Sequence, residues 1–484
     1  MACNAVATFV SINARSPCRS RSIRCAKLIA YQRGRPLSRV KVDAYSLLND
    51  APVVRSEGRT YPVNIRYGQA AKPNERIVER MVVTLRQALS DNPDSSILAF
   101  LPGQGEIHRT TEALGEWLVE RRIRGVHLRP MYGNLTLDEQ QQAIAPLTDA
   151  QAGERKVVLA TNIAETSLTI EGVDVVVDSG LVREARFDPG TGMTGLHTTR
   201  ISRASSTQRA GRAGRLAPGV CYRLWTESQQ EQLAAHNTPE ILRADLAPLA
   251  LQLLQWGVDD PAELRWLDVP PSGLWQQALD LLETLSAIAR KGKATVLTAH
   301  GQVMCNLPVH PRLAQLLICG AQAGHLNAAA NLASLLSERN PFSQENPDIS
   351  HPLDILAGKA KCPHQQQGWL QRTRQLANQF VEQIRSQKLP ESGVSFLLPA
   401  TQIHGYLLAC AYPDRLARRR HSGGYQLANG RSADLPDKHA LGNQAWLAIA
   451  EVSSMVGKSS DTIRSAAALD DKLFASALAD QVRA

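Results

Sequence analysis

A short arginine-rich stretch, residues 205–215 with the sequence S-S-T-Q-R-A-G-R-A-G-R, carries the residue types best suited to chemistry on a phosphate. The side chains in it that could contact a phosphate are Gln208, Arg209, Arg212 and Arg215. On a helix, the spacing of Arg212 and Arg215 would make the two side chains neighbours on one face. Two guanidinium groups so placed suit the spread negative charge of a γ-phosphoryl group in transfer. Gly211 and Gly214 would let the backbone approach a ligand closely, and the alternative is a solvated basic turn.

Two earlier segments place polar groups at the ends of predicted strands. The apolar strand predicted at residues 96–101 ends at Pro102-Gly103-Gln104-Gly105 and runs into a helix. A helix N-terminus behind a glycine turn is a ready anion site, and an ordinary strand-to-helix turn is the alternative. The strand predicted at residues 156–161 is followed by short hydroxyl and amide side chains, which suit a sugar-phosphate backbone. These side chains are Thr161, Asn162, Thr166 and Ser167.

The elements around these segments predict how they are positioned. Apolar spacing predicts helices at residues 75–89 and 137–145, and a strand at 173–177. This alternation predicts an α/β fold with a parallel, doubly wound sheet, which binds ligands at the carboxyl ends of its strands. Residues 182–187 and 194–201 flank a turn-rich loop and predict a β-hairpin. Such a hairpin could part a nucleic-acid duplex, or it could be an edge ribbon.

Length, composition and cysteine usage exclude several classes. A chain of 484 residues suits three or four domains, and no apolar run reaches the roughly 18–20 residues of a membrane span. The eight cysteines are scattered and form no C-x-x-C pair. This usage predicts reduced thiols in a cytoplasm and no metal site of the zinc type. Nothing in the sequence predicts a membrane or an obligate protein partner.

The basic charge is concentrated at the start of the chain. The net charge is +9, and residues 1–42 hold nine Lys and Arg without any Asp or Glu, so the remainder sums to zero. Any nucleic-acid footprint in the body of the protein is therefore expected to be local. An acid-free segment rich in Arg and Ser has the composition of an organellar transit peptide. We favour the other interpretation, that residues 1–45 are foreign to the fold.

Three motifs together resemble those of one enzyme family. The segments are L-P-G-Q-G-E-I at 101–107, A-T-N-I-A-E-T-S-L-T-I at 160–170 and Q-R-A-G-R-A-G-R at 208–215. Their order and spacing resemble motifs IV, V and VI of the DEAH-box (DEAH/RHA) helicases. The resemblance covers about residues 46–484 and includes L-P-V-H-P-R-L-A at 307–314 and A-Y-P-D-R-L-A-R-R-R at 411–420. It implies an ATP-dependent helicase that uses ATP with Mg²⁺ and acts on single-stranded nucleic acid, with RNA the expected type.

The resemblance also implies roles for individual residues. Arg212 and Arg215 would be arginine fingers, Gln208 would contact the γ-phosphate or the attacking water, and Gly211 would lie at the nucleotide. Arg209 does not match a finger position and is left as a structural residue. The residues implied to contact nucleic acid, and to couple it to nucleotide state, are Gly103, Gln104, Thr161, Asn162, Thr166 and Ser167.

The family also implies a domain order along the chain. After the atypical basic segment, residues 46–235 would form the second RecA-like helicase domain. A winged-helix domain is expected at 236–300, a ratchet-like helical bundle at 301–390, and an incomplete OB-like barrel at 391–484. A basic cluster at residues 415–421 could contact phosphates or be a solvated helix end.

Two motifs that such a helicase needs are missing from the sequence. Residues 1–95 contain neither the phosphate-binding loop G-x-x-x-x-G-K-[ST] nor an acidic D-E-x-H box. We therefore expect the chain to be the C-terminal portion of a helicase, truncated at its N-terminus and also at its C-terminus. ATP and Mg²⁺ would be held mainly by the absent first RecA-like domain, and activity of the chain alone is doubtful. The alternative is a non-catalytic nucleic-acid-binding remnant or adaptor.

Overall fold

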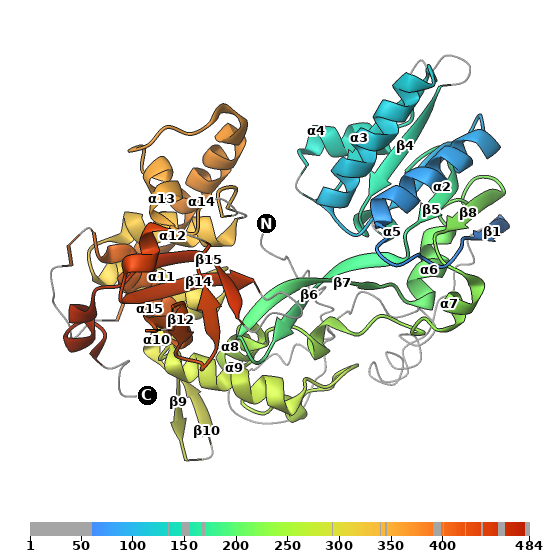
Figure 1. The fold of residues 1–484 in the computed structure, drawn as a ribbon. Coiled ribbons are helices and arrows are strands. Elements are labelled where there is room, and N and C mark those ends of the chain that lie inside the picture. The colour runs from blue at the N-terminus through green and yellow to red at the C-terminus, as the bar shows by residue number, and fades with distance from the viewer. Residues whose placement is uncertain are drawn as a thin grey trace.

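The structure is a computed structural model in which a sheet domain and a helical and barrel region are joined by a long hairpin (Figure 1). It describes residues 61–479, except 134, 148–153, 167–169, 293, 339, 344–345, 391–397, 400, 422, 437–438 and 454–459. The basic segment 1–45 and the predicted site residue Ser167 lie outside the described residues. Within the described part of the chain, no helix is long and apolar enough to cross a membrane.

A six-stranded parallel sheet forms the N-terminal half, in the order β1-β8-β5-β2-β4-β3. Its strands are β1 (Val63–Tyr67), β2 (Ser96–Phe100), β3 (Val126–Met131), β4 (Arg155–Ala160), β5 (Val173–Asp178) and β8 (Gly219–Arg223). The central strands β2, β4 and β5 are apolar runs because helices cover both of their faces. The predicted parallel, doubly wound sheet is therefore confirmed.

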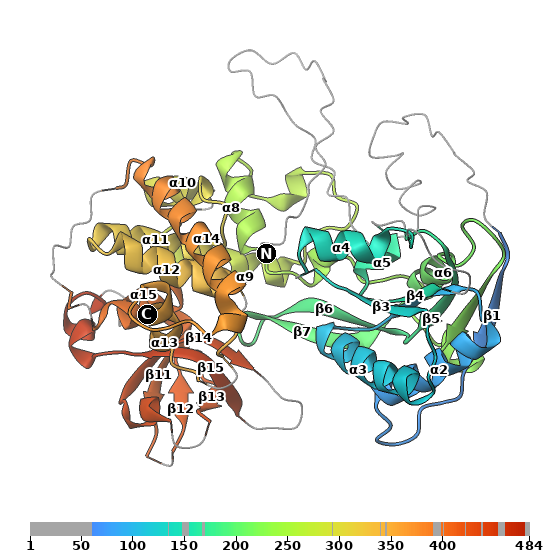
Figure 2. The same ribbon diagram turned by 90° about the horizontal axis from the view of Figure 1, so that it is seen from above.

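Helices cover the two faces of the sheet as separate layers (Figure 2). On one face lie α2 (Ile77–Asp91) and α3 (Gln104–Glu120), which bury Met81 and Leu114 against β2 and β4. On the other face lie α4 (Leu137–Ile144), α5 (Ile163–Thr166) and α6 (Arg203–Ala210), which contribute the small residues Ala143, Ala164 and Ala210. Small residues there allow α5 and α6 to lie close to the sheet. The short helix α7 (Glu227–Glu231) follows β8.

A two-stranded antiparallel hairpin leaves the sheet domain and reaches the C-terminal half (Figures 1 and 2). Its strands are β6 (Leu181–Asp188) and β7 (Met193–Arg200), so the predicted hairpin is confirmed. At the base, Val182 and Ile201 pack with Trp225 and Leu233. The tip, residues 189–192, lies against the C-terminal half.

The C-terminal half begins with two helices and a two-stranded wing. These elements are η1 (Glu240–Leu242), α8 (Ala247–Gln255), η2 (Pro261–Glu263), α9 (Ser272–Thr284), β9 (Ile288–Lys291) and β10 (Ala294–Leu297). More helices follow: α10 (Ala299–Cys305), α11 (Pro311–Gln322), α12 (Leu326–Ser337), α13 (Ser350–Leu356), η3 (His364–Gln366), α14 (Gln367–Arg385) and α15 (Ile403–Ala411). Helix, helix and wing are the arrangement expected of a winged-helix domain.

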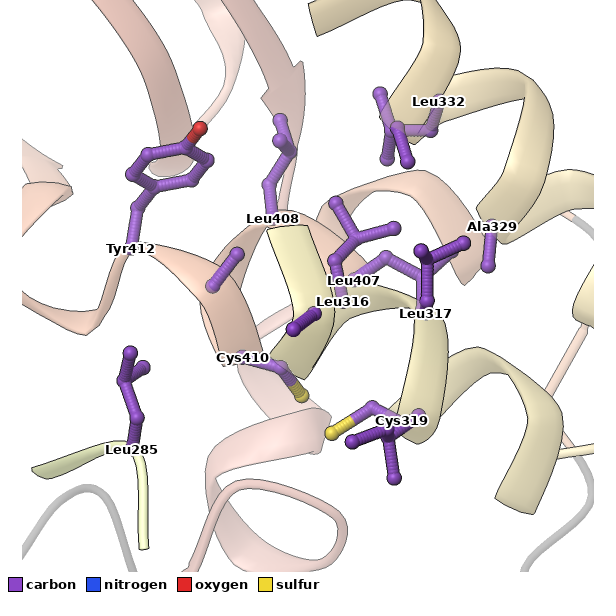
Figure 3. Close-up of a cluster of buried hydrophobic side chains, with 14 of the residues drawn as sticks. Leu285, Leu316, Leu317, Cys319, Ala329, Leu332, Leu407, Leu408, Cys410 and Tyr412 are labelled. Atoms are coloured by element: carbon purple, nitrogen blue, oxygen red, sulfur yellow. The ribbon is translucent and has the colours of Figure 1, made fainter. Parts of the chain in front are cut away.

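One apolar core runs through the whole C-terminal half, from Ile241 to Leu478. Figure 3 shows part of it, to which α11 contributes Leu316 and Leu317, α12 contributes Leu332 and α15 contributes Leu407. Because this core crosses residues 300 and 390, the predicted domain boundaries there do not coincide with separate cores. These boundaries stay a prediction.

The C-terminal strands close into a small barrel in the order β11-β12-β13-β15-β14. The elements are η4 (Pro413–Arg415), β11 (Leu416–Arg419), β12 (Tyr425–Leu427), β13 (Ser432–Asp434), η5 (Ala440–Asn443), β14 (Trp446–Ser453), β15 (Asp461–Ala468) and η6 (Asp471–Ala475). The predicted small barrel is confirmed. The basic cluster at 415–421 is not a solvated helix end, because its first residue closes η4 as a buried side chain and the next residues form β11. Arg415 is buried in front of β11, whereas Arg418 and Arg419 are exposed on that strand.

Candidate functional site

The arginine-rich stretch begins as a helix and ends as tight turns. Ser202 caps α6 by accepting a hydrogen bond from the Ser205 N–H, and the helix stops at Ala210. Beyond it, the Arg212 N–H donates to the Arg209 carbonyl at 3.1 Å, a three-residue spacing typical of turns. Arg212 and Arg215 are therefore not on a helix, although they still come together. Both border one small space beside Leu98, Ala164, Ile170 and Val173, which is too small to admit a water molecule.

Arg209 is an internal anchor, which agrees with leaving it as a structural residue. Its side chain is only 1% exposed and lies over the Phe100 ring, 4.8 Å from the ring centroid. Nη1 donates to Asp178 Oδ1 at 2.9 Å, and Nε donates to Glu165 Oε2 at 3.0 Å. Burial alone would lower the pKa of Arg209, but these two carboxylates more than offset it and raise the pKa. This guanidinium fixes α6 to the end of β5.

Glu165 joins the segment at 160–170 to the segment at 205–215. Its Oε1 accepts a hydrogen bond from Ser205 Oγ at 2.6 Å, and its Oε2 binds Arg209. Its backbone carbonyl accepts from Arg212 Nε at 2.9 Å and also from Nη2. One residue of α5 therefore orients both the anchor and the first predicted finger. Glu165 was not among the predicted site residues, although it is the sole carboxylate in that segment.

The Arg212 guanidinium lies in a poorly solvated, positively charged environment. It is 7% exposed, and burial together with the charge of Arg215 lowers its pKa to about 10, while Glu165 acts in the opposite direction. Arg212 is still cationic at neutral pH. A desolvated cation beside a second cation gains strongly when an anion approaches, because the low local dielectric strengthens the attraction.

Gln208 and Gly211 lie on the solvent side of the arginine pair. Gln208 is exposed on α6. Gly211 is also exposed, at the C-cap of α6, where its φ of −59° is an ordinary right-handed value. Exposure alone does not assign either residue to a ligand, so their roles at a nucleotide stay predictions.

Gly214 packs against the sheet instead of leaving room for a ligand. A Cβ at this position would lie 2.6 Å from the Tyr61 carbonyl oxygen and 2.7 Å from Val63 Cγ2, at the start of β1. We expect Gly214→Ala to lower the free energy of unfolding of the sheet domain by about 1–3 kcal/mol, as overpacking does. Urea denaturation measures this change.

Gly211→Ala is the matched control for that substitution. A Cβ at Gly211 would meet only the Gln208 and Thr207 carbonyl oxygens, at 3.4 Å. We expect its stability to stay within about 0.5 kcal/mol of the parent chain. Equal destabilisation by both substitutions would contradict the packing role of Gly214.

The predicted nucleic-acid residues follow two neighbouring strands. Phe100 of β2 is opposite Ala160 of β4, and the Leu101 N–H donates to the Ala160 carbonyl at 2.8 Å. The turns after these strands start side by side, so the structure brings Gly103 and Gln104 to the same sheet edge as Thr161 and Asn162. The Asn162 side chain is exposed there. Thr166 is the last residue of α5.

Gly103 and Gln104 form the start of α3 and lie among polar groups. Gly103 is the N-cap, and a Cβ there would lie 2.5 Å from Arg183 Nη1, so this guanidinium reaches across the helix start from β6. Gln104 Nε2 lies 3.2 Å from His108 Nε2, which is 3.1 Å from the Tyr132 hydroxyl. Burial raises the pKa of Tyr132. Arg183, His108 and Tyr132 could not be predicted as partners from the local sequence, because they come from other elements or from the next helical turn.

The arginine pair, the polar sheet edge and the parallel sheet are the features expected of a helicase C-terminal domain, and the comparison with known families agrees. The family model described as Helicase conserved C-terminal domain matches residues 80–217, which include the arginine pair and the sheet edge. The chain belongs to the DEAH-box (DEAH/RHA) helicase family.

Within that family the chain is similar to HrpB. It is 43% identical over 402 residues to the ATP-dependent RNA helicase HrpB of Escherichia coli, covering 83% of this chain and 45% of that protein. It is 38% identical over 297 residues to the pre-mRNA-splicing factor ATP-dependent RNA helicase prp22 of Schizosaccharomyces pombe, covering 60% of this chain and 25% of that protein.

The comparison with solved structures also finds similarity to HrpB. A crystal structure of the E. coli DExH-box NTPase HrpB matches with a TM-score of 0.73 and 38% identity, covering 91% of this chain and 50% of that one. A second crystal structure, of the E. coli DEAH/RHA helicase HrpB, has the same TM-score and covers 89% of this chain. The chain thus spans half or less of the length of these relatives, and corresponds to their C-terminal region.

Proposed function

We propose that this chain is the part of an ATP-dependent RNA helicase that supplies two arginine fingers and contacts the nucleic acid. The observation that carries the proposal is the Glu165 junction, which orients Arg212 beside Arg215 and lies three residues after Asn162. Arg212 and Arg215 would stabilise the charge that develops on the γ-phosphoryl group, with Gln208 at the phosphate or the attacking water. The named relatives are ATP-dependent RNA helicases, which favours ATP and RNA as ligands.

The nucleotide itself would be held mainly by a first RecA-like domain. The phosphate-binding loop G-x-x-x-x-G-K-[ST] does not occur in this sequence. In the described ranges, no group of three or more His, Cys, Asp and Glu side chains could hold a metal ion. We therefore assign Mg²⁺ to that other domain as well, and assign to this chain the fingers and the packing that orients them.

Nucleic acid would bind at the carboxyl edge of the sheet. Gly103 and Gln104 at the start of α3 and Thr161 and Asn162 after β4 offer amides and hydroxyls, which suit backbone contacts without base readout. Thr166 and Ser167 follow Glu165 in the chain, so they would link this surface to the arginine fingers. The scattered cysteines support a cytoplasmic location, and we propose no obligate protein partner.

The purified chain tests this proposal with two assays, ATP hydrolysis and binding of single-stranded RNA. We expect RNA binding that weakens with salt, by about 0.7 log units per log unit of salt for each phosphate contacted. We expect no ATP turnover by the chain alone, with or without RNA. Arg212→Ala should leave RNA binding unchanged, because the proposal assigns Arg212 to the nucleotide and not to the nucleic acid.

Two outcomes would overturn the proposed function. RNA-stimulated turnover by the chain alone would show a nucleotide site other than the one proposed. Absence of RNA binding at low salt would remove the nucleic-acid role of the sheet edge.

A further inference from the structure

A cleft of about 220 Å³ lies at the base of the β6–β7 hairpin. One wall is the segment that leads into α2 and includes Ala71 and Arg80, and another wall follows β8 and includes Trp225. The two ends of the hairpin, at Leu181 and Arg200, form a third side. The residues assigned above to the nucleotide and to the nucleic acid lie outside these walls, so the proposed function does not use the cleft.

The cleft lies at the carboxyl ends of three adjacent parallel strands. β1 ends at Tyr67, β8 at Arg223 and β5 at Asp178, and residues that line the cleft follow shortly after each of these ends. Open α/β sheets bind ligands outside the carboxyl ends of their strands. The proposed nucleic-acid residues follow β2 and β4, so the cleft occupies the other half of the same sheet edge.

A tryptophan packed on a glycine gives one part of the cleft its apolar lining. Gly180 has a φ of +72°, and a Cβ there would lie 2.7 Å from Trp225 Cε3. The Trp225 side chain is buried, and its Nε1–H donates to Gln230 Oε1 at 3.0 Å. Leu224 and Leu233 are buried beside it. Because the indole N–H already has a partner, an apolar group can bind here without leaving that donor unpaired.

Charged side chains line the rest of the cleft and leave a net positive charge. Arg80 and Glu75 offset each other, with Arg80 Nε 3.6 Å from Glu75 Oε2. Arg80 Nη2 also donates to the Leu224 carbonyl and, at 2.6 Å, to the Gln69 carbonyl, so this guanidinium is held in the wall. Arg200 is exposed and has no hydrogen-bonding or ion-pair partner within the described part of the chain. Its guanidinium is therefore available to an anionic ligand.

We propose that the cleft binds a small organic anion, with an apolar ring packed beside Trp225 and a carboxylate paired with Arg200. The volume sets the size of the ligand, because about 220 Å³ is less than the roughly 300–1,000 Å³ of sites for drug-sized molecules. The same chemistry occurs in a free aromatic acid and in a peptide in which tryptophan precedes aspartate.

A strand of nucleic acid suits the cleft less well. Binding of a phosphate backbone depends on several cations spread along the strand. The described residues that line the cleft supply one uncommitted cation, Arg200, next to the carboxylate of Glu75. The proposal is thus independent of the proposed function and adds a second kind of ligand.

Two indoles of opposite charge, indole-3-propionate and tryptamine, test the class of ligand. Saturation-transfer NMR measures their binding to the 484-residue chain, and hydrogen exchange at residues 179–181 and 224–233 locates it. We expect indole-3-propionate to bind with a Kd on the order of 1 mM, as is usual for a ligand of its size. Tryptamine should bind about fivefold more weakly. Arg200→Gln should remove this difference, whereas Arg203→Gln, which alters an exposed arginine outside the cleft, should retain it.

Ala71→Phe tests the location, because it places a ring in the cleft from an exposed position. We expect it to weaken indole-3-propionate about tenfold or more, since the added ring takes the space of the ligand. Ala70→Phe is the matched control, because Ala70 is also exposed but does not line the cleft. The blocked peptide acetyl-Gly-Trp-Asp-Gly-amide distinguishes the two sources. Tighter binding of the peptide than of indole-3-propionate would identify a polypeptide as the ligand, and weaker binding a free acid.

Four results would overturn the proposal. They are equal affinity for the two indoles, no binding of indole-3-propionate at about ten times the expected Kd, unchanged binding in Ala71→Phe, and displacement of indole-3-propionate by single-stranded RNA together with loss of RNA binding in Ala71→Phe. The last result would make the cleft a nucleic-acid contact. Failure of the indole assays with normal RNA binding by the parent chain would leave the proposed function standing.

Discussion

Replacing Arg212 with alanine is expected to lower ATP turnover about 10³-fold, on the scale of arginine fingers, in a helicase that combines this chain with a first RecA-like domain. The reason is the environment of this side chain. Arg212 is 7% exposed and lies beside Arg215, so a negatively charged phosphoryl group placed there would be attracted by two cations in a poorly solvated environment. Steady-state hydrolysis with saturating RNA gives kcat, and the loss should be in kcat because the interaction strengthens in the transition state.

Arg203→Ala provides the control for that measurement. Arg203 is on the same helix, α6, and its side chain is exposed. The Arg203→Ala substitution removes one positive charge and leaves Arg212 and Arg215 in place, so turnover should stay near the parent value. Near-normal turnover in Arg212→Ala would remove the finger assignment. Equal losses in both variants would show that net charge, and not position, controls turnover.

Replacing Arg209 with methionine is expected to lower the free energy of unfolding of the sheet domain by about 3–5 kcal/mol, the range for breaking a buried ion pair. The substitution retains much of the side-chain length but removes the cation between Asp178 and Glu165, whose side chains are 0% and 11% exposed. Their carboxylates would then be buried without the opposite charge that the fold provides.

Urea denaturation monitored by hydrogen exchange in β5 and α6 measures the loss of unfolding free energy in the domain that contains Arg209. Arg203→Met is the matched control, since an exposed substitution on the same helix should change stability by less than about 0.5 kcal/mol. A loss below 1 kcal/mol in Arg209→Met would contradict the anchor role. It would also reopen Arg209 as a candidate phosphate ligand.

Much of the fold and part of the site could be predicted from local pattern. The apolar runs that became β2, β4 and β5 are long enough only for buried strands, and their alternation with helices leaves a parallel sheet as the consistent arrangement. The turn-rich loop at 188–192 predicted the hairpin in the same way. The resemblance in the motifs at 101–107, 160–170 and 208–215 led to the helicase family, which the comparisons confirm.

The partners of individual residues could not be predicted, because they depend on elements distant in the chain. Arg209, Arg212 and Arg215 share one repeating pattern, yet Arg209 became an internal anchor once Asp178 and Glu165 closed around it. Gly214 follows the same repeat as Gly211. Only at Gly214 does β1 come so close that a Cβ has no room.

The sequence by itself determined the residue types, the order of the elements and the three motifs, because these depend on local spacing and short-range backbone preference. The tertiary structure decided which charges are buried and what they bind. Arg415 illustrates the difference. In the sequence it is the first member of a basic cluster, whereas in the fold it is buried against the hairpin tip and Arg418 remains exposed. The energy of a charge depends on the groups within a few ångströms of it, and folding alone determines those groups.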